Sequence, residues 1–165
     1  MMDLKYNGKS YIARAMGNIL SDRMSGAGLH VDIVLPVPVS RERMRKRGYN
    51  QSDLMAKAFM RRQAEGGGAF AKTPAYSNRI LYRCRETQML RGLDPAERTL
   101  AMDGAFAVTS SKKGSIRGKN ILLIDDIYTT GATADACAKA LKEAGCNAVY
   151  VLTLASGGNR KPPGI

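Results

Sequence analysis

Apolar positions follow two different spacings along the chain, one typical of helices and one typical of buried strands. Across Ser10–Met24 they recur every three or four residues, which predicts an amphipathic helix. Across Val31–Leu35 they form a short β-branched run that stops at Pro36, which predicts a buried strand entering a stiff loop. A second helix is predicted from about Asn50 to Gln63.

The middle of the chain gives weaker signals. Ala64–Tyr76 contains three consecutive glycines and a proline, and we interpret it as a flexible connection within one domain. The segment DPAERTLAM starts with a capping aspartate, a first-turn proline and an acid at the third position, so it predicts a short helix before a strand near Ala105–Val108. The segment SSKKGSIRGK is predicted to be an exposed basic turn.

The clearest unit lies in the last third of the chain. Asn120–Asp125 is a near-continuous apolar run, and the helix that follows a polar turn is expected to end at Gly145. A second buried strand is predicted at Ala148–Leu154. Two strands joined by a helix through such short turns are parallel with a right-handed crossover, so the sequence predicts an α/β fold.

Length and composition favour one self-sufficient domain. With 165 residues, 44% of them hydrophobic, the chain can build its own core, and we expect one domain over 1–155 and a flexible tail over 156–165. Cys84, Cys137 and Cys146 form no CxxC pair, so neither a disulfide framework nor a zinc site is expected. Without an apolar run of ~18 residues or a signal core, a cytoplasmic protein that makes no membrane contact is expected.

The charge balance favours a polyanionic partner. The chain has 26 Lys and Arg against 14 Asp and Glu, a net charge of +12. Half of this surplus lies in the segment Arg41–Arg62, with eight basic residues against Glu42 and Asp53. Two interpretations remain open: a solvated face that keeps the protein soluble, or a surface that contacts phosphates.

The sequence ILLIDDIYTTGAT carries the most specific chemistry. It places two carboxylates and a hydroxyl-rich turn at the carboxyl end of a parallel strand, where open α/β sheets bind ligands. Asp125 and Asp126, both expected to be exposed, suit sugar hydroxyls or a hydrated magnesium ion. Backbone amides of the turn can converge on a phosphate, and its glycine permits close approach. The turn consists of Thr129, Thr130, Gly131, Ala132 and Thr133.

Together these residues predict a ribose-phosphate site, with which other interpretations of the segment compete. A solvated strand end would explain the acids, and an ordinary helix cap would explain the threonines. The magnesium-binding strand of a P-loop NTPase is disfavoured. Only three residues separate Gly114 from the Gly118-Lys119 pair, where a P-loop has four, and these residues precede a strand instead of following one. A dinucleotide fold is disfavoured because no GxGxxG follows a strand.

At these residues the chain resembles a known family. ILLIDDIYTTGAT is similar to the phosphoribosyl pyrophosphate signature of type I phosphoribosyltransferases. LPVPVSRERMRKRGYNQ, RCRETQ and ERTLAMDGAF resemble landmarks of its ComF/GntX branch, the competence protein F-like proteins, and together the similarity covers about Lys5 to Ala155. The resemblance implies the type I phosphoribosyltransferase fold, an open, mostly parallel, twisted sheet flanked by helices with a small variable hood.

The resemblance also implies roles for individual residues. Asp125 and Asp126 would hold the ribose hydroxyls, Thr129–Thr133 would hold the 5′-phosphate, and magnesium would arrive with the pyrophosphate, with the two acids as further ligands. The pyrophosphate would be approached by the loop after the first strand and by a mobile flap over Arg79–Arg98, for which an ordinary surface loop is the alternative. The residues in question are Pro38, Arg47, Arg83, Arg85 and Gln88.

Three features depart from the family pattern. Members of the branch usually begin with a four-cysteine zinc module, which this sequence lacks, so no protein-bound zinc is expected and a longer natural chain stays open. Ala101 stands where an asparagine is common. The chain also ends in a segment rich in glycine, proline and lysine.

Two functions are compatible with this pattern. The first is transfer of ribose 5-phosphate between phosphoribosyl pyrophosphate and a nitrogen nucleophile, with an acceptor that the sequence does not identify. The second is a non-catalytic competence or DNA-uptake protein that binds nucleotide, single-stranded DNA or a competence helicase, with Arg41–Arg62 against the DNA. Aromatic residues make up 6% and tryptophan is absent, which weakens a base-stacking platform. A homodimer is left open.

Overall fold

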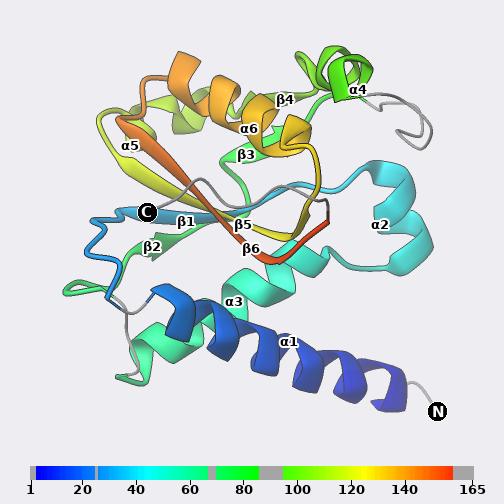
Figure 1. Ribbon diagram of the computed structural model, residues 1–165, viewed down its shortest axis with the longest axis vertical. Helices are drawn as coiled ribbons and strands as arrows, with labels where there is room; N and C mark the ends of the chain where they lie inside the picture. Colours follow the sequence, from blue (N-terminus) through cyan, green and yellow to red (C-terminus); the bar gives the residue numbers. More distant parts are fainter. Residues whose placement is uncertain (1–2, 25, 67–69, 86–94, 158–165) are drawn as a thin grey trace.

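The computed structural model describes residues 3–24, 26–66, 70–85 and 95–157, and a four-stranded sheet lies at its centre (Figure 1). All strands of this sheet run parallel, in the order β2-β1-β5-β6. They are β1 (Ile33–Pro36), β2 (Ala75–Tyr76), β5 (Asn120–Tyr128) and β6 (Ala148–Ser156). A separate antiparallel pair joins β3 (Leu81–Arg83) to β4 (Phe106–Val108). The α/β class expected from the sequence is confirmed.

Helices cover both faces of the sheet. In Figure 1, α1 (Asp3–Met24) and α3 (Gln51–Ala64) lie side by side below it, and α6 (Ala132–Glu143) lies above it with the β3-β4 pair. Shorter elements complete the described chain: α2 (Arg41–Arg47), α4 (Pro95–Met102), the 3-10 turn η1 (Ser110–Lys112) and α5 (Lys113–Ile116). No helix among the described residues has the length and apolar character needed to cross a bilayer.

The core lies in two layers because the apolar run of β5 is buried on both faces. Ile121 and Leu123 face α6, whereas Leu122 and Ile124 face α1 and α3, where Phe59 is also fully buried. When consecutive residues of a strand are buried on opposite faces of the sheet, the apolar pattern in the sequence is continuous and does not alternate. This is typical of parallel strands covered by helices on both sides. The uninterrupted pattern in the sequence is therefore explained by helices on both sides.

The main elements follow the sequence-based expectations closely. The expected helix over 50–63 is α3, the crossover helix is α6, and the strand expected at Ala148–Leu154 extends to Ser156. The first helix begins at Asp3, earlier than predicted. The tail over 158–165 and Gln88 lie outside the described residues.

Three expectations about connections need correction. The stiff loop after β1 contains a helix, α2, which the prolines in the sequence obscured. The connection Ala64–Tyr76 ends in a strand, β2, which pairs with β1. The basic turn over 110–119 is not wholly exposed, because it forms η1 and α5 and buries Ile116 completely in the α6-side core.

Candidate functional site at the carboxyl edge of the sheet

The two acids lie on β5 near its carboxyl end, not in a turn after the strand. Asp125 Oδ1 accepts hydrogen bonds from Ser52 Oγ at 2.9 Å and from the backbone N of Asp126 at 2.9 Å. Ser52 is 2% exposed and lies in the first turn of α3. The expectation of two exposed acids is therefore wrong, since both side chains are half-buried and Asp125 is held by a buried hydroxyl.

The electrostatics of Asp125 follow from this position. Burial and the charge of Asp126 raise the pKa of Asp125, and the hydrogen bonds from Ser52 and the Asp126 amide lower it, which together give a pKa of about 6. Desolvation is the largest of these effects because it disfavours the carboxylate form. A carboxyl group whose pKa is raised to about 6 at the carboxyl edge of a parallel sheet, where such sheets bind ligands, is a candidate functional group.

The turn after β5 is built around a glycine that cannot be replaced without strain. Gly131 has a φ of +87° and is buried at the start of α6, where its carbonyl accepts from Asp135 N at 2.8 Å. A Cβ at this position would lie 2.5 Å from the Tyr128 hydroxyl oxygen. The backbone here can thus approach an anion closely, at the positive end of a 12-residue helix.

A small pocket joins the acid to this turn. It brings together four expected residues, Asp125, Thr129, Gly131 and Thr133, whereas Asp126, Thr130 and Ala132 do not line it. It also has walls that the sequence analysis missed: Ile127, Tyr128, Ala134, Val151 and Thr153. Thr153 pairs with Asp125 in the parallel register of β5 and β6, so aligning the ends of the two predicted strands would have found it.

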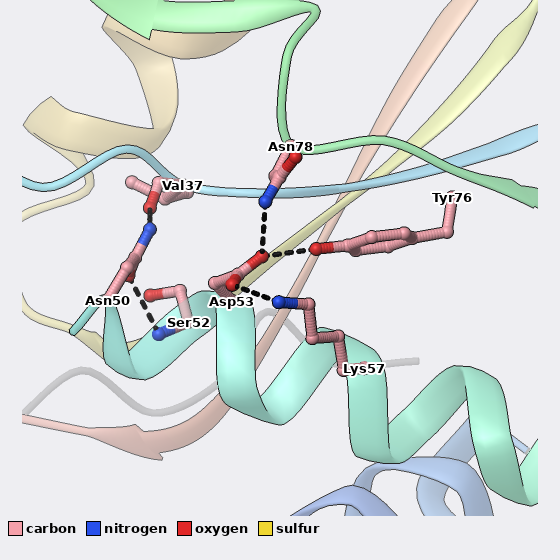
Figure 2. Close-up of polar contacts among 7 residues, drawn as sticks. All are labelled: Val37, Asn50, Ser52, Asp53, Lys57, Tyr76 and Asn78. Atoms are coloured by element: carbon pink, nitrogen blue, oxygen red, sulfur yellow. Dashed lines mark hydrogen bonds and ion pairs between the residues drawn. The ribbon is translucent and has the colours of Figure 1, made fainter.

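The loop after β1 lies against the same edge. Val37 N donates to the carbonyl of Ile124 at 2.9 Å, and Asn50 Nδ2 donates to the carbonyl of Val37 at 3.0 Å (Figure 2). Asn50 Oδ1 in turn accepts from Ser52 N at 3.0 Å and caps α3. Pro38 is half-buried in this loop, and Arg47 is exposed in the last turn of α2.

Arg83 and Arg85, which the sequence places in the expected flap, contact residues near the β3-β4 pair. The Arg83 guanidinium lies 5.4 Å from the centre of the Phe106 ring, and its Nε donates to the carbonyl of Arg85 at 3.2 Å. Arg85 Nη2 donates to the carbonyl of Asp103 at 2.5 Å. Neither arginine lines the pocket that contains Asp125 and Gly131.

A second polar cluster, centred on Asp53, ties β2 to α3 (Figure 2). Asp53 accepts hydrogen bonds from the Tyr76 hydroxyl and from Asn78 Nδ2, the latter at 3.3 Å, and pairs with Lys57 Nζ at 2.8 Å. Burial and the neighbouring carboxylate raise the pKa of Tyr76. Sequence reasoning counted Asp53 only as a charge within a basic segment.

Comparison with known proteins agrees with the fold and the motif. Residues 60–164, nearly two thirds of the chain, match the phosphoribosyl transferase domain family. The chain is 31% identical over 124 residues to competence protein F of Haemophilus influenzae and 32% identical over 142 residues to competence protein ComFC of Bacillus subtilis. These alignments cover 75% and 86% of this chain. The chain therefore belongs to the type I phosphoribosyltransferase family, in its competence protein F-like branch.

The relatives are longer than this chain. The chain spans about half the length of the two competence proteins, 50% and 51%. It is also 27% identical to the DNA utilization protein YhgH of Escherichia coli K12, over 92% of this chain and 63% of that protein. Among solved structures, an allosteric regulatory enzyme of purine biosynthesis matches with a TM-score of 0.50 at 20% identity, covering 86% of this chain and 25% of that enzyme.

Proposed function

We propose that this site binds phosphoribosyl pyrophosphate with magnesium and transfers ribose 5-phosphate to or from a nitrogen nucleophile, with pyrophosphate as the other reactant or product. One observation carries the proposal: a single pocket joins the half-buried carboxyl of Asp125 to the Gly131 turn at the start of α6. Such a pocket offers hydrogen-bond acceptors for ribose hydroxyls on one side and donors for a phosphate on the other.

The turn supplies the phosphate end of the site. Gly131 has no side chain that would keep a ligand from its backbone, and the first turn of α6 has no side-chain cap and presents its positive dipole end. Thr129 and Thr133 both line the pocket, so their hydroxyls add donors. A dianionic 5′-phosphate is the ligand group that this set of donors fits.

The acids supply the ribose end. Departure of pyrophosphate leaves positive charge on the anomeric carbon and its ring oxygen, and fixed carboxylates nearby stabilise that charge. With a pKa of about 6, Asp125 is mainly ionised at pH 7 and above, so it can accept from a ribose hydroxyl. No covalent nucleophile is needed for this reaction.

The two carboxylates of the site fit a magnesium ion that enters together with the phosphates of the ligand. Within the described ranges, no three His, Cys, Asp or Glu side chains gather as a metal-binding group, so the protein offers at most the two carboxylates of Asp125 and Asp126. Magnesium is commonly held by one or two carboxylates together with substrate phosphates and waters. Bound in that way, the ion would neutralise the charge that develops on the leaving pyrophosphate.

The test combines binding and turnover. We expect calorimetry to show magnesium-dependent binding of phosphoribosyl pyrophosphate, and a panel of purine and pyrimidine bases to identify one acceptor that releases pyrophosphate. The double change Asp125→Asn with Asp126→Asn should abolish binding, whereas Asp103→Asn, an exposed acid paired with Lys139, should not. Binding that survives the double change would remove the acids from the site.

A second function is favoured by the relatives and by α2. The names of the relatives refer to competence and DNA utilization, and α2 carries five basic side chains with none of its residues buried. In this alternative the fold binds a nucleotide, and the basic surface contacts single-stranded DNA or a competence helicase. The absence of turnover with every base, together with salt-sensitive DNA binding, would favour it.

A further inference from the structure

Four hydrogen bonds link the first acid to the loop after β1 and close into a ring. The ring runs from the Ile124 carbonyl to Val37 N, from the Val37 carbonyl to Asn50 Nδ2, from Asn50 Oδ1 to Ser52 N, and from Ser52 Oγ back to Asp125 Oδ1. Each bond measures between 2.9 and 3.0 Å. The peptide bond between Ile124 and Asp125 completes it.

Ser52 is the member of this ring that reaches the acid. It is 2% exposed, and its hydroxyl and the Asp126 amide both donate to Oδ1 of Asp125. Two donors on one oxygen fix the rotation of the carboxyl group, so Oδ2 is the oxygen that can accept from a ligand hydroxyl. Ser52 thus decides which way Asp125 faces, although it does not itself line the pocket.

We infer that Ser52 is a positioning residue of the site, which orients Asp125 toward the ribose and connects that acid to the loop expected to approach the pyrophosphate. The inference rests on the proposed function for its ligand. A helix-capping role alone would not require the hydroxyl, because Ser52 contributes its backbone amide to the Asn50 cap. The hydroxyl instead crosses to β5, 73 residues further along the chain.

The experiment measures ligand affinity by calorimetry with three probes: phosphoribosyl pyrophosphate with magnesium, ribose 5-phosphate, and pyrophosphate with magnesium. Because a small misplacement of a binding group is costly, Ser52→Ala should weaken the two ribose-containing probes at least about 10-fold. Pyrophosphate reaches Asp125 only through a shared magnesium ion in this arrangement, so its affinity should fall less than the affinity for the ribose-containing probes. Ser52→Thr, which keeps the hydroxyl, should recover most of the affinity for the ribose probes.

Two further variants separate the ring from general effects on folding. Asn50→Asp keeps the acceptor that caps α3 but removes the amide that donates to Val37, so it opens the ring at another bond and should also weaken phosphoribosyl pyrophosphate. Ser21→Ala removes another buried serine hydroxyl, which accepts from Gln63 about 16 Å further along α3. It should lower stability and leave all three affinities unchanged.

The outcomes distinguish this inference from the proposed function. Wild-type affinity for the ribose probes in Ser52→Ala, or in Asn50→Asp, overturns the inference and leaves the proposed function standing. A wild-type chain that binds none of the probes overturns the proposed function. The inference is then decided by the carboxyl carbon chemical shift of Asp125: a shift that moves in Ser52→Ala and returns in Ser52→Thr supports the orientation, and an unmoved shift overturns it.

Discussion

The hydroxyl oxygen of Tyr128 lies 2.5 Å from the point where a Cβ on Gly131 would stand. The tyrosine thus closes over the turn that begins α6, and the glycine is required for two separate reasons. Its φ of +87° disfavours any side chain, and the tyrosine removes the space for one. Both residues border the same small pocket, so a change at either one affects the expected phosphate site.

Gly131→Ala should destabilise the protein by roughly 1–3 kcal/mol, because it combines backbone strain with the clash against Tyr128. It should also weaken phosphoribosyl pyrophosphate binding sharply, as the turn must shift to make room. Chemical denaturation and calorimetry on the same sample measure the two effects.

A matched control separates the strain from the clash. Gly118 has a φ of +69° with nothing within 4 Å of its Cβ position, so Gly118→Ala carries backbone strain alone. It should cost less stability and leave ligand affinity unchanged. Adding Tyr128→Phe to Gly131→Ala should restore part of the stability, since the nearest atom is removed. Equal losses in the two alanine variants would contradict the role of Tyr128.

Asp125 should make stability depend on pH in an unusual direction. Its folded pKa of about 6 lies above the ordinary value of 3.8, so the folded state binds the proton more tightly than the unfolded chain. The loss of stability caused by the buried charge of Asp125 is therefore present above pH 6, falls between pH 6 and pH 4, and is absent below pH 4. Asp125→Asn should stabilise the protein at pH 7 by on the order of 3 kcal/mol and have little effect at pH 4.

In Asp125→Asn the side-chain oxygen can still accept hydrogen bonds from Ser52 and the Asp126 amide. Its effect on stability therefore reports the lost charge and not a lost contact. Denaturant midpoints across the pH range check the expectation. Ligand affinity should fall at the same time, because functional sites often retain groups that lower stability. An equal change in stability at both pH values would show that burial does not perturb this carboxyl group.

The sequence predicts those parts of the fold whose signals are local. The β5-α6-β6 unit could be read directly, because the apolar run, the turn and the helical spacing are consecutive in the chain. The helix α2 could not, because all of its side chains are exposed and no apolar periodicity marks it. The two-residue strand β2 is visible only through its pairing with β1, which is a long-range contact.

In the candidate site, too, the sequence predicts the features that depend on neighbouring residues and misses those that depend on distant ones. The acids and the glycine turn form one motif, and the structure brings Asp125, Gly131 and two of the threonines into one pocket. The environment of Asp125 was misjudged because Ser52, which contacts it, is 73 residues away in the sequence. A motif gives the identity of its residues, but their burial and pKa depend on segments that the motif does not contain.

The Asp53 cluster should contribute to stability through its half-buried members. Tyr76→Phe removes a hydrogen bond to an ionised carboxylate that is 15% exposed, which should cost about 1–3 kcal/mol. Lys57→Met removes an ion pair whose lysine side chain is 54% exposed, and should cost less than about 1 kcal/mol. Chemical denaturation compares the two variants. A larger loss for Lys57→Met would mean that the ion pair, rather than the tyrosine, joins β2 to α3.

The last prediction concerns the exposed basic face of α2 and tests the alternative function. If its side chains contact the backbone of single-stranded DNA, each lost phosphate contact should reduce the slope of log affinity against log salt by roughly 0.7. Changing Arg43, Arg45 and Lys46 together to glutamine should therefore lower the slope by about 2. Fluorescence anisotropy with a labelled single-stranded oligonucleotide, measured over a range of salt, gives the slope.

The chain offers a control with the same change in net charge. Lys112, Lys113 and Arg117 are exposed around α5, away from α2 in Figure 1, and they precede β5 at the amino ends of the strands. Changing these three to glutamine should leave the slope nearly unchanged if the DNA follows α2. Equal reductions in both triple variants would mean that the chain's overall charge of +12, not this helix, attracts the polyanion. An unchanged slope in the α2 variant would show that its basic residues only solvate the surface.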